Sequence, residues 1–334
     1  MISIFLYAFF ISLFTLILII FFSHKYQLFI DDSNEEKPQN FHEESTPRAG
    51  GIGILLGMSL LVALPLGLKF LLSIFLAFLS GIFEDFHNSL SPKLRLILQI
   101  IAAFSAVWIT NSVVTYLGLG INMPYWVGVI FSVFAIVGMM NAVNIIDGFN
   151  GLASGVTLLI LLSFAIVSYQ QNNLEILSII IISLGSTLGF FILNFPKGKI
   201  FLGDGGAYLS GFIVAIIGIF LASKYESVSP WYILAIFIYP VWEVVFSIIR
   251  RLIRGHSALG ADANHLHTLI YKHITNNNPL TTLLILFTTL PFMTIATIYP
   301  NLSKTNIAVT CCFILYYSIF YYYLYKKEKK YVSR

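Results

Sequence analysis

The sequence contains little charge, little cysteine and no P-loop. Charged residues make up 10% of its 334 residues and hydrophobic residues make up 58%, which excludes an ordinary water-soluble domain and predicts an integral membrane protein. The two cysteines, Cys311 and Cys312, are adjacent in an apolar stretch, which favours neither a disulfide framework nor a zinc site. The pattern G-x-x-x-x-G-K-[ST] occurs nowhere, so a P-loop nucleotide-binding protein is excluded as well.

Basic residues are in slight excess and give a formal net charge of +4. They are scattered through short loops without a basic face or interleaved aromatic residues, so we expect no nucleic acid among the partners. Basic loops beside apolar segments are instead typical of proteins that cross a membrane and contact its lipid.

Eleven apolar stretches predict eleven transmembrane helices, since about 20 apolar residues cross the hydrocarbon core. No soluble domain or internal repeat interrupts them, so we expect a single polytopic all-α membrane domain over residues 1–334. The first stretch has no basic residue before it, which favours a span over a cleaved signal peptide. The expected spans are residues 2–22, 50–66, 70–83, 94–110, 124–142, 151–169, 175–193, 206–222, 230–249, 281–299 and 305–325.

The division between the second and third spans depends on Pro65, Gly67 and Lys69. With a hairpin there, 16 of the 19 Lys and Arg residues fall on one side of the membrane; without it, only 13 do. Cytoplasmic loops carry the excess of basic residues, so the larger asymmetry supports the hairpin. We therefore expect an external amino terminus and a cytoplasmic carboxyl terminus.

Six polar segments interrupt the apolar sequence, and this topology places all of them on the cytoplasmic side. Acids, amides and histidines from separate loops on one face are the pattern of an assembled active site. The segments are the run around Thr46-Pro47-Arg48, the Glu84-Asp85 pair, Asn141 to Asp147, Lys197 to Asp204, Arg250 to His267 and a lysine-rich tail.

The first candidates for chemistry are carboxylates and amides at helix ends. Glu84 and Asp85 follow the third span, where they could bind a divalent cation, act as a base or form a solvated pair. Asn141, Asn144 and Asp147 are spaced by three residues on an apolar helix, so their side chains lie near one face. Polar groups at that depth are costly unless they face protein or a water-filled cavity, which favours a binding site.

The segment from Lys197 to Asp204 is rich in glycine but needs another way to hold phosphate than a P-loop. Mg²⁺ on Asp204 could bridge two phosphates while Lys197 and Lys199 counter the remaining charge. A plain Gly-Asp-Gly turn is the alternative.

The fifth segment offers Arg251, His265 and His267 as hydrogen-bond donors to phosphate oxygens. The histidines lack a third ligand for zinc, and arginines at this position also anchor lipid headgroups. Glu243 lies within an expected span, seven residues before Arg250. Seven residues make about two helical turns, so the two can share a face. Glu243 is either a buried structural partner or part of the cavity.

The polar motifs form an ordered series: T-P-R-A-G-G at 46–51, G-I-F-E-D at 81–85, S-P-K-L-R-L at 91–96, N-A-V-N-I-I-D-G-F-N-G-L at 141–152, F-L-G-D-G-G at 201–206 and D-A-N-H-L-H at 262–267. This series resembles the polyprenyl-phosphate N-acetylhexosamine-1-phosphate transferases of glycosyltransferase family 4. The family includes WecA-type and TagO-type initiating enzymes and, more distantly, the MraY translocase.

The resemblance implies transfer of N-acetylhexosamine 1-phosphate, with GlcNAc as the default sugar, from a UDP-sugar to undecaprenyl phosphate. The reaction would need Mg²⁺, with Mn²⁺ as an alternative, and would release UMP at the cytoplasmic face of the bacterial inner membrane. Its product would start a lipid-linked cell-surface glycan, such as an O-antigen or a teichoic-acid-like polymer. A homodimer is a further expectation.

The resemblance also implies roles for individual residues. The matched positions are Asp204 for the metal, Glu84 and Asp85 for the family's Asp-Asp pair, Asn144 and Asp147 for the nucleotide-sugar pocket, and His265 and His267 for the histidine motif near the diphosphate. Expected catalytic residues are Glu84, Asp85, Asp147, His265 and His267. Expected substrate contacts are Arg48, Asn141, Asn144, Lys197, Lys199 and Arg251.

Three positions depart from the family pattern. Glu84 stands where many relatives have Asp, so its carboxylate extends one methylene farther. Thr268 replaces a third histidine, which moves the chain away from MraY, and Ala207 replaces a common Ser.

The sequence has two alternative interpretations. A transporter or flippase would be similarly apolar, but it would place ionisable residues near the membrane midplane and show paired repeats. Within the enzyme class, the alternative is the MraY reaction on UDP-MurNAc-pentapeptide. Eleven spans with an internal carboxyl terminus, Arg48 and the His-Leu-His-Thr run favour the WecA-like branch.

Overall fold

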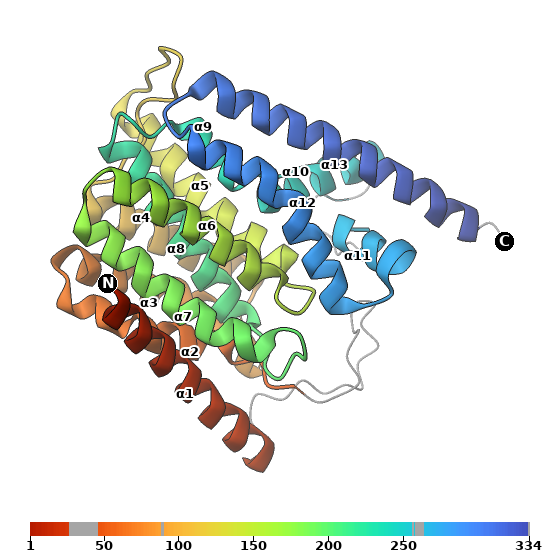
Figure 1. Ribbon diagram of the computed structural model, residues 1–334, viewed down its shortest axis with the longest axis horizontal. Coiled ribbons are helices and arrows are strands. Elements are labelled where there is room, and N and C mark those ends of the chain that lie inside the picture. The colour runs from red at the N-terminus through yellow and green to blue at the C-terminus, as the bar shows by residue number, and fades with distance from the viewer. Residues whose placement is uncertain (27–45, 88–89, 256, 258–263, 333–334) are drawn as a thin grey trace.

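The computed structural model is a bundle of helices (Figure 1). It describes residues 1–26, 46–87, 90–255, 257 and 264–332. In these ranges the chain forms no β-strand, and its β-type pairings are isolated bridges, such as Arg48 with Phe201 and Tyr116 with Asn122. The all-α membrane fold expected from the sequence is confirmed.

Nine helices of the described part are long and apolar enough to cross a membrane, or ten if the bent pair of α9 and α10 is one span. The nine are α1 (Ile2–Tyr26), α3 (Pro65–His87), α4 (Pro92–Thr110), α5 (Tyr125–Ile146), α6 (Leu152–Gln170), α7 (Leu174–Asn194), α8 (Gly203–Lys224), α12 (Asn278–Ile298) and α13 (Ser303–Val332). The shorter elements are α2 (Gly50–Gly57), η1 (Met58–Ala63), α9 (Pro230–Ile236), α10 (Ile238–Ile253), α11 (Leu266–Ile270) and η2 (Tyr271–Thr275).

The second expected span is shorter than its apolar sequence indicates. Helix α2 tightens into the 3₁₀ segment η1, and Leu64 then adopts an extended conformation before Pro65 begins α3. A residue before proline is restricted to such conformations, and proline suits the first turn of a helix. The hairpin at Pro65 is confirmed, because Gly51 at the start of α2 and Gly81 near the end of α3 both pack on the start of α8. The sidedness of the termini stays a prediction.

Helix α8 is the centre of the bundle. Its apolar window is 94% buried, against 17% for that of α1, and α8 packs against α2, α3, α5 and α6. A helix that is apolar on all sides is suited to such a core position. Its first turn, with Asp204, is therefore surrounded by the ends of neighbouring helices.

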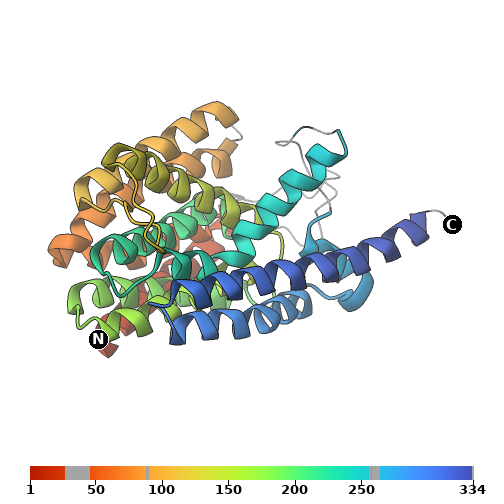
Figure 2. The same cartoon turned by 90° about the horizontal axis from the view of Figure 1, so that it is seen from above.

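The ninth expected span is bent by 77° between α9 and α10. Pro240 lacks the N–H that would bond to the carbonyl of Ile236, so the helix breaks at this point. Beyond the bend, α10 runs away from the axis of the bundle, and the carboxyl-terminal half of α13 also extends past it (Figure 2). The chain between α10 and α13 carries the histidine motif in α11.

Candidate active site

The polar segments come together at one end of the bundle. Phe201 donates its N–H to the carbonyl of Pro47 and accepts the N–H of Gly50, each at 2.9 Å. The side chain of Asn150 donates to the carbonyl of Pro196 at 3.0 Å. These bonds join the first segment to the Lys197 loop and that loop to the end of α5, as the expected one-sided topology requires.

Asp204, in the first turn of α8, is the meeting point of three helices. Its Oδ2 accepts a hydrogen bond from Arg95 Nη1 on α4 at 3.0 Å, and its Oδ1 accepts one from Asn144 Nδ2 on α5 at 3.1 Å. Arg95 also lies 3.7 Å from Glu84 Oε1 at the end of α3. The Asp204 side chain keeps 30% of its surface exposed, so a ligand can reach it.

Asp85 ties α3 to the start of α8. Its two carboxylate oxygens accept the backbone N–H groups of Asp204 and Gly205, at 2.7 and 2.9 Å. These are N–H groups of a helix amino terminus, which have no partner within the helix and favour negative charge. This contact fixes the position of Asp204; a catalytic role for Asp85 or Glu84 stays a prediction.

The amide and acid positions on α5 have different partners. Asn141 donates to Gln99 Oε1 on α4 and to the carbonyl of Val137, both at 2.8 Å, whereas Asn144 reaches Asp204. Asp147 is the residue after the last turn of α5. Burial raises the pKa of Asp147 well above its usual range, and the charge of Asp204 raises it further. Asp147 therefore accepts a proton more readily than an exposed aspartate.

The expected basic contacts lie around this cluster. The exposed Arg48 opposes the rise in the Asp147 pKa, so its charge acts on the acids. Lys197 and Lys199 are exposed on the loop before α8. Arg251 instead donates from Nε to the carbonyl of Ser257 at 2.6 Å. Substrate contacts by these residues stay predictions.

The histidines form a second part of the site. Their rings are stacked with centroids 5.2 Å apart and an interplanar angle of 12°. His265 Nδ1 lies 3.0 Å from Glu243 Oε1, while His267 packs edge-on against Phe149. A Cβ built on Gly148 would lie 3.7 Å from His267 Nε2, so the pair borders the end of α5. Residues 262–263 of the histidine motif lie outside the described residues.

Several polar residues at this end were not predicted to have a role in the site. Arg95 was not among the expected site residues, yet it binds Asp204. Asn194 joins two loops, because its Oδ1 accepts the N–H of Gly151 at 2.6 Å and its Nδ2 donates to the carbonyl of Ile200 at 2.7 Å. Asn194 was recognisable as an amide at the end of a span.

The cluster suits a divalent cation by its charge. Among the described residues, no group of three His, Cys, Asp or Glu side chains could hold a metal ion. Mg²⁺, however, is commonly bound by one or two carboxylates together with substrate phosphates, so such a cage is not required. Four carboxyl groups, of Glu84, Asp85, Asp147 and Asp204, lie close to the guanidinium groups of Arg48 and Arg95, and a bound cation would favour the ionised form of Asp147 that burial disfavours. Carboxylate oxygens are ligands that Mg²⁺ prefers, so the donor set is compatible with this cation; Asp204 as its ligand stays a prediction.

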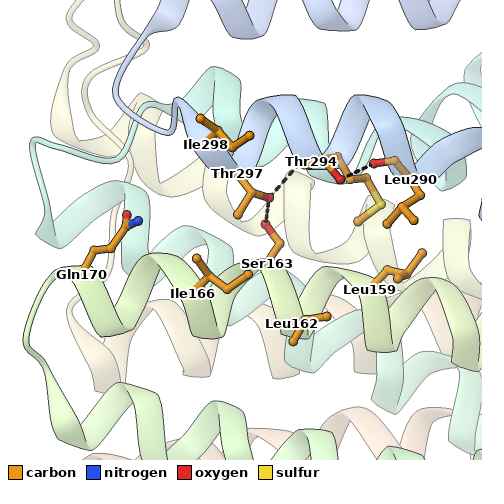
Figure 3. Close-up of a pocket in the computed structure, with 10 residues that line it drawn as sticks. Leu159, Leu162, Ser163, Ile166, Gln170, Leu290, Thr294, Thr297 and Ile298 are labelled. Carbon is orange, nitrogen blue, oxygen red and sulfur yellow. Dashed lines mark hydrogen bonds between the residues drawn. The ribbon is translucent and has the colours of Figure 1, made fainter.

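A separate cavity of about 310 Å³ lies between α6 and α12, and its lining is mostly apolar (Figure 3). Ser163 and Thr297 form a hydrogen bond of 2.6 Å at its wall. None of the expected site residues lines this cavity, so it has no part in the polar site.

His267 is expected to make stability depend on pH. Its side chain is buried, and burial lowers its pKa from the ordinary 6.5 to about 3. Between these values the unfolded chain binds more protons, so the stabilisation is complete above pH 6.5 and is lost as the pH falls towards 3. We expect the melting temperature in detergent to fall over this range, and His267→Gln to reduce the fall. An unchanged pH dependence in that variant would contradict the assignment.

Comparison with known proteins places this chain in a family. Residues 68–222 match the family model described as glycosyl transferase family 4. A probable undecaprenyl-phosphate N-acetylglucosaminyl 1-phosphate transferase of Bacillus subtilis (strain 168) is 28% identical over 291 residues, which are 78% of this chain and 75% of that protein.

Two streptococcal relatives are phospho-N-acetylmuramoyl-pentapeptide-transferases. The protein of Streptococcus sanguinis (strain SK36) is 30% identical over 66% of this chain and 72% of its own length. That of Streptococcus agalactiae serotype III (strain NEM316) is 32% identical over 58% of this chain and 64% of its own length.

Proposed function

This chain belongs to glycosyl transferase family 4, and we propose that it transfers N-acetylhexosamine 1-phosphate from a UDP-sugar to undecaprenyl phosphate. GlcNAc is the first choice of sugar, because the Bacillus relative carries that sugar in its name. The observation that carries the proposal is the cluster around Asp204, where helices α3, α4 and α5 bring acids, an amide and Arg95 to the start of α8.

The proposed reaction joins the acceptor phosphate to the sugar phosphate. An oxygen of undecaprenyl phosphate attacks the β-phosphorus of the UDP-sugar, the bond from that phosphorus to the bridging oxygen breaks, and UMP leaves with the electron pair. A phosphate monoester with a second pKa near 6 is mostly dianionic at pH 7, so the acceptor hardly needs a base. Charge neutralisation is then the main contribution of the protein.

The residues around Asp204 provide that neutralisation. Mg²⁺, or Mn²⁺ in its place, would be held by Asp204 and would supply positive charge to the phosphate oxygens. Asn144 holds one oxygen of the Asp204 carboxylate, and Asp85 fixes the backbone beside it. Arg95, Lys197 and Lys199 counter phosphate charge, and His265 donates to the diphosphate.

The expected sides and location follow from the substrates. Both the UDP-sugar and the phosphate of undecaprenyl phosphate are reached from the cytoplasm, so we place this end of the bundle at the cytoplasmic face of the inner membrane. The product would begin a lipid-linked cell-surface glycan. We also propose that two copies of this protein form a homodimer.

A panel of UDP-sugars tests the function. Membranes that contain the protein, given undecaprenyl phosphate and Mg²⁺, are expected to release UMP from UDP-GlcNAc faster than membranes without it. UDP-GalNAc and a UDP-6-deoxy-HexNAc are the competing sugars. Release from UDP-MurNAc-pentapeptide alone would favour the second candidate, a phospho-MurNAc-pentapeptide transferase, which the streptococcal relatives support. Transport of a lipid without UMP release would reject both.

A further inference from the structure

Glu243 is a buried carboxylate that contacts the histidine segment. It lies in α10, three residues after Pro240, and its side chain is 1% exposed. Removing a carboxylate from water is costly unless hydrogen bonds or a positive charge compensate for it. Two hydrogen bonds to Oε1 come from the start of the histidine segment, from His265 Nδ1 and from the backbone N–H of Leu266, both at 3.0 Å, and the hydroxyl of Tyr317 on α13 also interacts with this carboxylate.

These two bonds determine how His265 is held. A carboxylate accepts hydrogen bonds, so the ring hydrogen must be on Nδ1, which leaves Nε2 available to a ligand. The second bond fixes the backbone next to the ring, so His265 can neither rotate nor shift along the chain without losing a partner of Glu243. The carboxylate also compensates positive charge when Nε2 takes up a proton, as the aspartate of a catalytic triad does.

The rest of α10 supports the same segment. Arg250, seven residues after Glu243, is buried and donates to the carbonyl of Asn264 and to the hydroxyl of Tyr321 on α13. Its Nη2 donates to the hydroxyl oxygen of Ser247 at 3.2 Å. One face of α10 therefore holds the residue before His265 through Arg250 and the residue after it through Glu243.

The two stacked histidines are not equivalent. His267 is enclosed by Phe149 and Gly148 and has no carboxylate among its described hydrogen-bond partners, whereas His265 is bonded to one. His265 is therefore the member of the pair suited to carry or transfer a proton.

We propose that Glu243 is the positioning residue of His265: it accepts the Nδ1 proton and compensates the charge of the imidazolium, so that the protonated Nε2 donates to the phosphate oxygens of the reacting diphosphate. This inference rests on the proposed transferase function and names a residue through which that function works. Glu243 acts through His265 and does not itself touch the substrate.

A double-mutant cycle on UMP release tests the proposal. Glu243→Gln keeps the size and an acceptor oxygen but loses the charge. At pH 7 it should lower kcat about 10- to 100-fold, leave the KM for the UDP-sugar within about twofold, and displace the pH profile of kcat. His265→Ala should lower kcat at least as much. The double variant should equal His265→Ala alone, because Glu243 has no separate route to the reaction.

Glu175→Gln is the matched control. Its carboxylate bonds to the N–H of Leu66 at the opposite end of the bundle, at 2.7 Å, so the wild-type kcat and pH profile are expected. If Glu243→Gln does not accumulate in membranes, Glu243→Asp and Glu243→Ala are compared instead. The aspartate keeps the charge, so it should retain more activity per amount of protein than the alanine. Full activity of Glu243→Gln, or a further loss in the double variant, would overturn the inference. Absence of UMP release by the wild-type protein would overturn the proposed function instead.

Discussion

Replacing Asp204 by asparagine is expected to lower the rate of UMP release by about a thousandfold or more. Asp204 accepts hydrogen bonds from Arg95 and Asn144 and is the proposed Mg²⁺ ligand. The substitution keeps the shape of the side chain but removes the charge that holds the cation, and electrostatic stabilisation of the transition state is the largest contribution expected here. The measurement is kcat as a function of Mg²⁺ concentration, at equal amounts of protein in the membrane.

Glu226→Gln is a suitable control for this prediction. Glu226 is exposed in the loop between α8 and α9, at the other end of α8, so the same loss of a carboxylate charge should leave the rate and the Mg²⁺ dependence unchanged. If Asp204→Asn retained a near-normal rate with the same Mg²⁺ dependence, Asp204 would not be the metal ligand. If both variants lost activity equally, a general effect of charge would explain the result.

The sequence predicts the composition of this site better than its contacts. Asp204 and Asn144 are recognisable because each interrupts an apolar stretch in a motif of the family. Their direct hydrogen bond joins residues 60 positions apart, and the bond between Arg95 and Asp204 joins residues 109 positions apart. No periodicity within one helix encodes such a pairing. From the sequence alone, Arg95 is only a basic residue at the end of an expected span, and its contact with Asp204 becomes evident once α4 and α8 are placed side by side.

Burial is the feature that hydropathy describes least well in this protein. Helix α1 is the most apolar candidate span but is mostly exposed on the outside of the bundle, whereas α8 is almost completely buried. In a membrane, apolar side chains are equally suited to lipid and to protein, so hydropathy cannot separate the two. The small residues of α8, which allow close approach of neighbouring helices, are the better indication.

The ninth span has local sequence features that position a residue far along the chain. Pro240 indicates that the helix breaks, and the seven-residue spacing of Glu243 and Arg250 indicates a shared face. The structure confirms that both side chains act on the same segment, around His265. His265 could not be predicted as the partner of Glu243, because the two residues are 22 positions apart and are brought together by the packing of α10 and α11 against α13.

Replacing Gly81 by valine should separate the acidic pair from Asp204. A Cβ at Gly81 would lie 2.5 Å from the backbone carbon of Asp204 and 2.5 Å from the nitrogen of Gly205, so α3 would have to move away from α8. Asp85, one turn later, would then lose its bonds to the start of α8. Overpacking of this kind costs about 1–3 kcal/mol, and a displacement of about 1 Å can lower a rate about a hundredfold.

Gly138→Val provides the same substitution in a place that can accept it. A Cβ at Gly138 on α5 has no atom within 4 Å, and valine is a better helix former than glycine, so stability and UMP release should be retained. The melting temperature in detergent and kcat are measured for both variants. A lower melting temperature and a large loss of kcat in Gly81→Val alone would show that the contact of α3 with α8 aligns the acids. A Gly81→Val protein with wild-type kcat would show that the reaction does not depend on this alignment.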